Sequence, residues 1–443
     1  MRLAERAQEL VGRGDHRRWE RWAWPAAIAA AIAARYGAES LRHRREGGFG
    51  YELSADLAVD SEEFVRAAES LTGAPITEGN EAELLINGDA IFPAFLETIR
   101  AAERTLNLET YVYWRGEIAR DVAEAIAERA RAGVSCKVLL DALGAAKMER
   151  GLVGAMREAG AEVRLFRPPK PYAVRRLVNR THRRVLVADG RVGMTGGVGI
   201  AAEWTGDAED PEHWRDTHVR VRGPVVRGLQ GAFAENWLEA TGEVLAGADY
   251  LPELEPAREG GGPMQLVRSR AGVGDTNVEA LYFLAIGAAQ RAIDLTAAYF
   301  VPRPAFTDAL VAAARRGVRL RILVPGPHID KGFVRVAGRA AYAELLDAGV
   351  EIFEYQPTML HAKTMVVDGA WSSVGSVNFD NRSFQLHDEA TLCVWSEEFA
   401  GELTEVFEAD LERSEPMIEE RWRRRGPVQR LGESASRLLR REL

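Results

Sequence analysis

The sequence has little cysteine, no long apolar run and no overall basic charge. Two of its 443 residues are cysteines, Cys136 and Cys393, and both lie in apolar, strand-like stretches, so no disulfide framework is implied and buried free thiols are expected. The uncharged stretch at residues 22–34 is shorter than the ~20 residues that span a bilayer, and Pro25 interrupts it. A net charge of −9 argues against a protein that coats nucleic acid.

Charge is unevenly distributed along the chain. Residues 1–50 carry a net charge of +4 and residues 421–443 a net charge of +6, which leaves −19 for the residues between them. The tail combines its Arg residues with Trp422 and three leucines, a composition that suits binding to an anionic membrane surface. The three tryptophans between residues 19 and 24 would suit the headgroup layer in the same way. We therefore expect membrane contact at both ends, with solvated helices packed on the domains as the alternative.

The chain contains an internal repeat. Three segments match three later ones in the same order of helix and strand: 99–114 with 286–301, 123–141 with 307–325, and 152–168 with 341–357. Each half is predicted to run β-α-β-α-β-β, an α/β pattern with buried strands. The expected organisation is a helical lead-in at 1–80, a first domain at 81–248, a linker at 249–275, a second domain at 276–415 and a basic amphipathic tail at 416–443.

Both halves also carry the same short motif. It consists of a His, a cation two residues later and an Asp five residues after that: His182, Arg184 and Asp189, then His361, Lys363 and Asp368. Side chains alternate in a strand, so each His shares a face with its cation, whereas each Asp faces the other way and is expected to form the turn with the Gly that follows. A single His beside an apolar strand is usually a satisfied core residue. Two copies in matching context indicate a catalytic pair at a phosphate site.

Further residues complete the predicted site. Ser376 and Asn378 lie in a small-residue loop behind the second motif, where they offer donors to phosphate oxygens. An imidazole that attacks or donates a proton needs a carboxylate to fix its tautomer. Glu389, downstream of His361, and Asp216, downstream of His182, are the expected carboxylates, each for the His of its own half.

Two further histidines lie near these acids in the sequence and are not expected to take part in catalysis. His218 and His387 are expected to form structural hydrogen bonds. No cluster of His, Cys and Asp at metal-ligand spacing is evident near the motifs, so neither a metal nor another cofactor is expected.

The stretches HAKTMVVDG at 361–369 and GSVN at 375–378 resemble the doubled motif of the phospholipase D superfamily. The chain is further similar to the bacterial cardiolipin synthase group over roughly residues 80–415, through INGDAIFPAFLETIRAAERTLNLETYVYW, PTMLHAKTMVVDG and GSVNFDNRSF. The resemblance implies two similar α/β domains, each a mixed sheet flanked by helices, related by a pseudo-twofold around one metal-free active site. It also implies the form of this group without N-terminal membrane-spanning helices.

The resemblance implies a reaction as well. In it, His182 attacks phosphorus to form a phosphohistidine, and His361 acts as acid and base while phosphatidylglycerol is converted to cardiolipin. The substrates are phospholipids, and the location is the cytoplasmic face of a bacterial inner membrane. Arg184 stands where Lys is usual and Gly199 where Asn is usual. Two alternatives remain: hydrolysis of a phospholipid, with nucleic acid disfavoured as substrate by the acidic middle of the chain, and lipid binding without catalysis.

Overall fold

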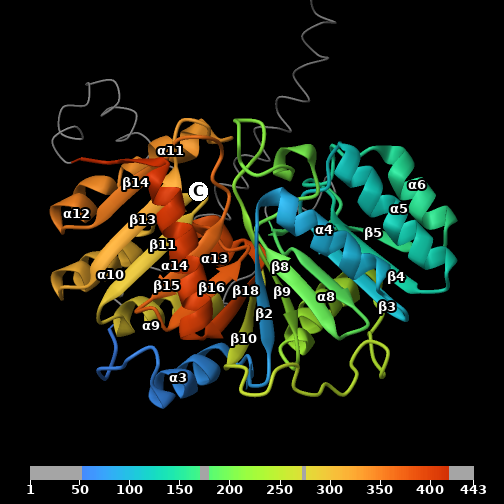
Figure 1. Cartoon of the computed structure of the whole chain (residues 1–443), viewed down its shortest axis with the longest axis horizontal. Helices are drawn as coiled ribbons and strands as arrows, with labels where there is room; N and C mark the ends of the chain where they lie inside the picture. The colour runs from blue at the N-terminus through green and yellow to red at the C-terminus, as the bar shows by residue number, and fades with distance from the viewer. Residues whose placement is uncertain (1–51, 170–178, 272–275, 419–443) are drawn as a thin grey trace, which may run out of the picture. The chain divides into compact units, whose positions relative to one another are not determined.

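The computed structural model describes residues 52–169, 179–271 and 276–418, which belong to the compact unit beginning at Gly48 (Figure 1). The three early tryptophans, the lead-in up to residue 51 and the basic tail beyond residue 418 lie outside the described residues. None of the helices formed by those three ranges combines the length and the apolar character that a membrane crossing requires.

The first half builds a mixed sheet. Its seven strands within the described residues are, in spatial order, β2 (Glu81–Ile86), β9 (Thr217–Arg222), β8 (Val192–Gly196), β7 (Val185–Ala188), β3 (Thr105–Thr110), β4 (Ser135–Asp141) and β5 (Glu162–Phe166). The associated helices are α4 (Asn87–Arg100), α5 (Glu117–Arg131), α6 (Arg150–Glu158), the short η1 (Ala202–Trp204) and α8 (Val226–Thr241). β3, β4 and β5 run parallel, and the other neighbours are antiparallel.

Both faces of this sheet are covered. Leu186 packs into a core with α4, α5 and α6, whereas the adjacent Val185 and Val187 join a different core with α8. This explains the unbroken apolar run of β7, because a strand that is buried on both faces has no solvent side for polar residues.

The second half repeats the pattern. The strand order among the described residues is β1 (Ile76–Thr77), β10 (Met264–Ser269), β18 (His387–Trp395), β16 (Trp371–Gly375), β15 (Lys363–Val367), β11 (Ala292–Ala297), β13 (Arg319–Pro325), β14 (Glu351–Tyr355) and β19 (Ser414–Pro416). The helices are α3 (Glu62–Thr72), α9 (Asn277–Ala288), α10 (Pro304–Arg315), α11 (Gly332–Arg339), α12 (Tyr342–Asp347), α13 (Asn381–Gln385) and α14 (Glu397–Glu412). β12 (Phe300–Val301) pairs with β17 (Phe379–Asp380), and β6 (Arg180–Thr181) pairs with β18.

One predicted boundary is wrong. The expected linker at 249–275 contains β10, which pairs with β18 along its whole length and with β1 at its start. The Pro- and Gly-rich stretch before β10 is irregular, but MQLVRS carries enough apolar residues to form a buried strand. The lead-in contributes as well, because Phe64 and Ala68 of α3 lie in the core of the second sheet.

Two equivalent turns fix the hairpins that carry the motifs. Asp189 and Asp368 both have a φ of 54°, and the Gly after each also has a positive φ, as a two-residue hairpin turn requires. The carboxylate of Asp368 accepts hydrogen bonds from the backbone N–H groups of residues 290, 291 and 292, and Asp189 accepts from those of residues 103, 104 and 105. Each Asp therefore ties its turn to the start of the neighbouring strand, β11 or β3.

Candidate active site

The two halves interlock at the residues that precede the motifs. β6 pairs in parallel with the start of β18, and a matching parallel bridge joins Arg215 to Leu360. The backbone N–H of His182 donates to the carbonyl of Asp388 at 2.8 Å, and that of His361 donates to the carbonyl of Arg215 at 2.7 Å. Each His is thus held beside the strand of the other half that carries an acid. In Figure 1, β16 and β18 of one sheet lie against β8 and β9 of the other.

Each imidazole is paired with the carboxylate of the opposite half. His361 Nδ1 lies 2.7 Å from Oδ2 of Asp216, and His182 Nδ1 lies 3.1 Å from Oε2 of Glu389. All four side chains are buried. The predicted acids are therefore present, but the predicted partners are wrong. Strand alternation within one half gives the face of a side chain, and it does not reveal that the segment before each His crosses to the other sheet.

Two further donors hold the carboxylates. Trp204 Nε1 donates to Oδ2 of Asp216 at 2.8 Å, and Ser376 Oγ donates to Oε2 of Glu389. The carbonyl of Ser376 also lies 3.0 Å from His182 Nδ1. In both pairs the acid engages Nδ1, so Nε2 is the nitrogen left to react. Trp204 was missed by sequence reading because it lies in η1, outside both motifs, and its indole meets Asp216 only in the folded chain.

The two cations lie on the faces of their histidines. Lys363 Nζ is 3.2 Å from Nδ1 and 3.4 Å from Nε2 of His361, and Arg184 places one guanidinium nitrogen 3.3 Å from each ring nitrogen of His182. Both cations also donate to the backbone carbonyl of the same His. Arg184 Nε is buried and has no hydrogen-bond partner in the part of the chain that the structure describes, so this guanidinium has donor capacity for an anion.

Burial and these cations set the protonation states of the site. Burial lowers the pKa of His361 to about 4, with a further contribution from the charge of Lys363. The pKa of His182 is lowered well below its ordinary value, first by burial and then by Arg184. Burial lowers the pKa of Lys363 to about 7. Without a bound anion, both imidazoles are consequently neutral at pH values near 7.

The acids remain ionised in this environment. Burial alone would raise the pKa of Asp216, but His361 and Lys363 hold it far below the ordinary range of a carboxyl group. The pKa of Glu389 is likewise lowered, because its contacts with His182 outweigh burial. A negative carboxylate that accepts from Nδ1–H stabilises the imidazolium that forms when Nε2 takes a proton.

The small-residue loops differ between the halves. Asn378 is buried, and its Oδ1, a hydrogen-bond acceptor, has no partner among the described residues. In the first half a Cβ at Gly197 would lie 2.1 Å from Oδ1 of Asp216, and a Cβ at Gly199 would lie 2.7 Å from that of Val112. Gly199 therefore does more than omit a phosphate donor, because the space for a side chain is already filled.

Aromatic rings surround the imidazoles. Tyr111, which follows β3, lies 5.2 Å from the ring of His182, and Tyr299, which follows β11, lies 6.3 Å from that of His361. The rings of Trp204 and Trp214 lie 5.1 Å and 5.7 Å from His361. Sequence reading did not select these residues, although Tyr111 and Tyr299 both follow strands of the repeat and a polar aromatic residue at such a position was an available signal.

The prediction that no metal binds rested on the absence of a cluster of potential ligands near the motifs, and this premise is wrong. His182, His387 and Glu389 place one ligand atom each within 4.8 Å of one another. The sequence hid this group because His182 comes from one half and the other two residues from β18 of the other half. His218 is buried, and burial lowers its pKa to about 3.

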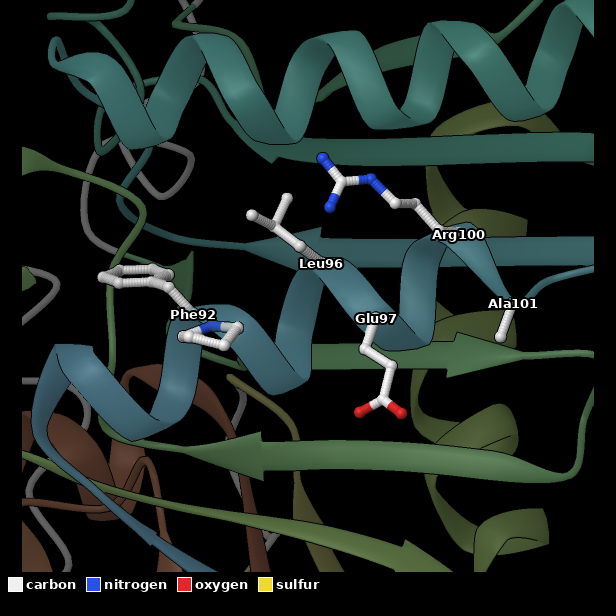
Figure 2. A pocket seen from close by; sticks show the side chains of 6 residues that line it. Phe92, Leu96, Glu97, Arg100 and Ala101 are labelled. Atoms are coloured by element: carbon white, nitrogen blue, oxygen red, sulfur yellow. The ribbon is translucent and has the colours of Figure 1, made fainter.

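The surface pocket shown in Figure 2 lies away from this constellation. Its lining residues come from α4 and the residue after it: Phe92, Pro93, Leu96, Glu97, Arg100 and Ala101. Glu97 is engaged by Arg220 at 2.6 Å. The pocket contains none of the motif residues.

Comparisons with known proteins agree with this architecture. A family model described as "Cardiolipin synthase, PLD-like domain" matches residues 95–210 and 282–411, so each match contains one motif. A cardiolipin synthase of Geobacillus kaustophilus is 34% identical over 384 residues, which cover 86% of this chain and 76% of that protein. Cardiolipin synthase A of Pseudomonas fluorescens is 34% identical over 376 residues, which cover 85% of this chain and 78% of that protein.

The fold has a counterpart among solved structures. The phosphatidylserine synthase of Haemophilus influenzae superposes with a TM-score of 0.61 at 14% sequence identity, covering 86% of this chain and all of that one. At that identity the likeness concerns the fold alone. Together with the family match over both halves and the relatives at 34% identity, it leads to one conclusion: the chain belongs to the cardiolipin synthase family of proteins with phospholipase D-like domains.

Proposed function

We propose that this protein is a phosphatidyltransferase that makes cardiolipin from two molecules of phosphatidylglycerol through a phosphohistidine intermediate. The curated relatives are named cardiolipin synthases. The observation that carries the proposal is the pair of crossed dyads, in which each of two buried imidazoles has a carboxylate on Nδ1 and a cation against its ring.

In the first step, Nε2 of His182 attacks phosphorus and the bond to the departing glycerol breaks. Glu389 accepts the Nδ1–H of His182 and so keeps the lone pair on Nε2. Lys363 and Arg184 offset the charge of the phosphate oxygens, and the NH₂ group of Asn378 donates a hydrogen bond to them. His361 supplies the proton that the leaving glycerol oxygen needs.

The second step reverses these roles. His361, now neutral, takes the proton from a glycerol hydroxyl of the second phosphatidylglycerol, and that oxygen attacks the phosphohistidine. The bond from phosphorus to Nε2 of His182 breaks, which restores the imidazole and releases cardiolipin. Water in place of the second lipid would give phosphatidic acid.

His361 takes up its proton from the solvent when the anionic substrate binds. With a pKa of about 4 the imidazole is neutral in the empty site, and Asp216 is the contact that favours its charged form. A bound phosphodiester adds a negative charge beside Lys363, the group whose charge otherwise disfavours the imidazolium. Substrate binding therefore raises the pKa of His361 toward the range in which a general acid works.

Membrane contact also belongs to the proposal. Leu143 follows β4 and is 39% exposed, and α11, which follows β13, exposes 57% of Phe333 and 39% of Val336. Both segments adjoin aromatic residues of the site: a Cβ at Gly144 would touch Tyr111, and Lys331 Nζ lies 4.7 Å from the ring of Tyr299. These apolar side chains support contact between the two segments and a bilayer.

The location follows from the same reasoning. We propose that the protein is peripheral on the cytoplasmic face of the inner membrane, with the basic tail on anionic headgroups. The two buried free cysteines suit a reducing compartment.

Vesicle sedimentation tests the contact with the membrane. Deletion of residues 421–443 and the double substitution Phe333→Ser, Val336→Ser should each weaken binding to anionic vesicles. Unchanged binding of both variants would remove the membrane role from both regions.

Product analysis tests the reaction. Purified protein is incubated with phosphatidylglycerol vesicles, and lipids and glycerol are identified by mass spectrometry. Cardiolipin and glycerol in equal amounts support the transferase. Phosphatidic acid and glycerol without cardiolipin would identify a hydrolase, and recovery of unchanged substrate would identify a lipid-binding protein without catalysis.

A further inference from the structure

A group of potential metal ligands lies at His182 itself. His387 and Glu389 are two residues apart on β18, and the ring of His387 lies 5.5 Å from that of His182. Nδ1 of His182 is 3.1 Å from Oε2 of Glu389, and Nδ1 of His387 is 3.7 Å from Oε1 of the same carboxylate. Zinc–nitrogen bonds of ~2.0–2.1 Å in a tetrahedral site put neighbouring ligand atoms about 3.3 Å apart. One ligand atom from each of the three side chains lies within 4.8 Å of the others, so a contraction of the group would bring them to metal-binding distances.

Unpartnered atoms distinguish this group from an ordinary hydrogen-bond network. Nδ1 of His387 and Oε1 of Glu389 are both buried, and neither has a hydrogen-bond partner within the described residues. Their separation of 3.7 Å is too long for a hydrogen bond. Buried polar atoms normally have partners, so these two atoms have coordinating capacity that a bound cation would use.

We propose that His182, His387 and Glu389 form an inhibitory site for a divalent transition-metal ion of the zinc type. Two imidazoles and one carboxylate are a donor set that such ions accept, with a further position left for water. The ion takes the place of the proton that His182 shares with Glu389, and that proton moves to Nε2 of the same ring. Nε2 then lacks the lone pair for attack on phosphorus; this consequence, unlike the metal binding, rests on the proposed function.

The surrounding charges set the strength of binding. A nitrogen of the Arg184 guanidinium lies 3.3 Å from Nδ1 of His182, so its positive charge opposes the incoming cation. With three protein ligands and this opposition, the site should bind more weakly than structural zinc sites with four ligands. We expect micromolar affinity and reversal by a chelator. A hard cation such as Mg²⁺, which prefers oxygen ligands, should not bind.

Calorimetric titration of the full chain with zinc chloride tests binding. His387→Asn removes one ligand and leaves His182 and Glu389 in place. His213→Asn is the matched control, because His213 belongs to the other metal-capable group, with Glu209 and Asp210. We expect one micromolar event in the wild type and in His213→Asn, and its loss in His387→Asn. Thermal unfolding should agree, with zinc raising the Tm of the two binding proteins only.

The effect on catalysis is expressed for each variant as the ratio of its transfer rate with zinc to its transfer rate without zinc. A change in the basal rate of a variant therefore does not affect the comparison. Zinc should suppress transfer by the wild type and by His213→Asn, chelator should restore it, and His387→Asn should resist. Equal zinc binding by wild type and His387→Asn, or no binding by either, would overturn the site. Binding through His387 in a protein that transfers no lipid would uphold the site and refute the proposed function instead.

Discussion

Asp216→Asn tests the crossed pairing most directly. Both oxygens of Asp216 accept hydrogen bonds. Oδ2 accepts from His361 Nδ1 at 2.7 Å and from Trp204 Nε1 at 2.8 Å, and Oδ1 accepts from the backbone N–H of Thr217 at 2.8 Å. An amide has only one oxygen, so in either orientation its NH₂ group faces an N–H donor. If the NH₂ group replaces Oδ2, His361 must move its proton to Nε2, which is the wrong tautomer for taking a proton from the incoming hydroxyl.

The size of the effect follows from these contacts. A hydrogen bond to a charged group contributes ~1.5–3 kcal/mol, which corresponds to a factor of about 10–150 in rate. A forced tautomer change adds to this and reaches about 10⁴-fold in a Ser-His-Asp enzyme. We therefore expect kcat to fall by ~10²–10⁴ while the protein stays folded.

The assay is the initial rate of cardiolipin formation, with the Tm recorded for each variant. Asp210→Asn is the matched control, because Asp210 lies 2.8 Å from His213 in a similar but partly exposed pair outside the site. NMR titration gives a second readout: the substitution should lower the pKa of His361 further, since Asp216 raises it, and leave the titration of His182 unchanged. A kcat close to that of the wild type, or a shift at His182 alone, would refute the pairing.

Further predictions concern the same constellation. His182→Ala and His361→Ala should each abolish transfer, and the double variant should be hardly worse because the two groups act as a unit; near-full activity of His182→Ala would end the two-histidine mechanism. Activity should survive a strong chelator, and loss of activity with rescue by a divalent ion would count against the proposed chemistry. Asp368→Asn should lower the Tm with little effect on turnover, since Asp368 holds three backbone N–H groups, whereas Glu389→Gln should do the reverse; swapped effects would contradict these placements. The folded-state pKa of His361, about 4, lies below the ordinary 6.5, so the unfolded chain binds the proton first and the free energy of unfolding should fall as pH drops from 6.5 toward 4. Denaturant titrations across that range measure this fall, which His361→Asn should reduce.

Much of this site could be predicted because it is encoded locally. The spacing of His361 and Lys363 places both on one strand face, and the turn at Asp368 depends on the Gly beside it. The acids at positions 216 and 389 could be chosen as candidates because each lies at the start of a strand downstream of a motif. Their partners could not be assigned, because the exchange between halves depends on tertiary pairing that no periodicity records.

The same limit explains the other errors. β10 lies in a segment whose composition resembles a linker, and only its pairing with β18 makes it part of a sheet. The group of His182, His387 and Glu389 joins residues separated by about half the chain. The space filled by Val112 at Gly199 is likewise a property of packing. The local sequence pattern therefore predicts which residues are candidates for the site, whereas the tertiary fold determines which of them contact each other.

The interlocked halves have a consequence for the synthesis of the protein. The acid that orients His182 lies 207 residues further along the chain. At ~5–20 residues per second, a ribosome needs about 10–40 s to add that stretch. During this time the emerging chain holds one imidazole without its carboxylate and lacks the second motif for most of the interval. A polypeptide that ends before Glu389 therefore lacks one of the two crossed dyads on which the proposed transfer depends.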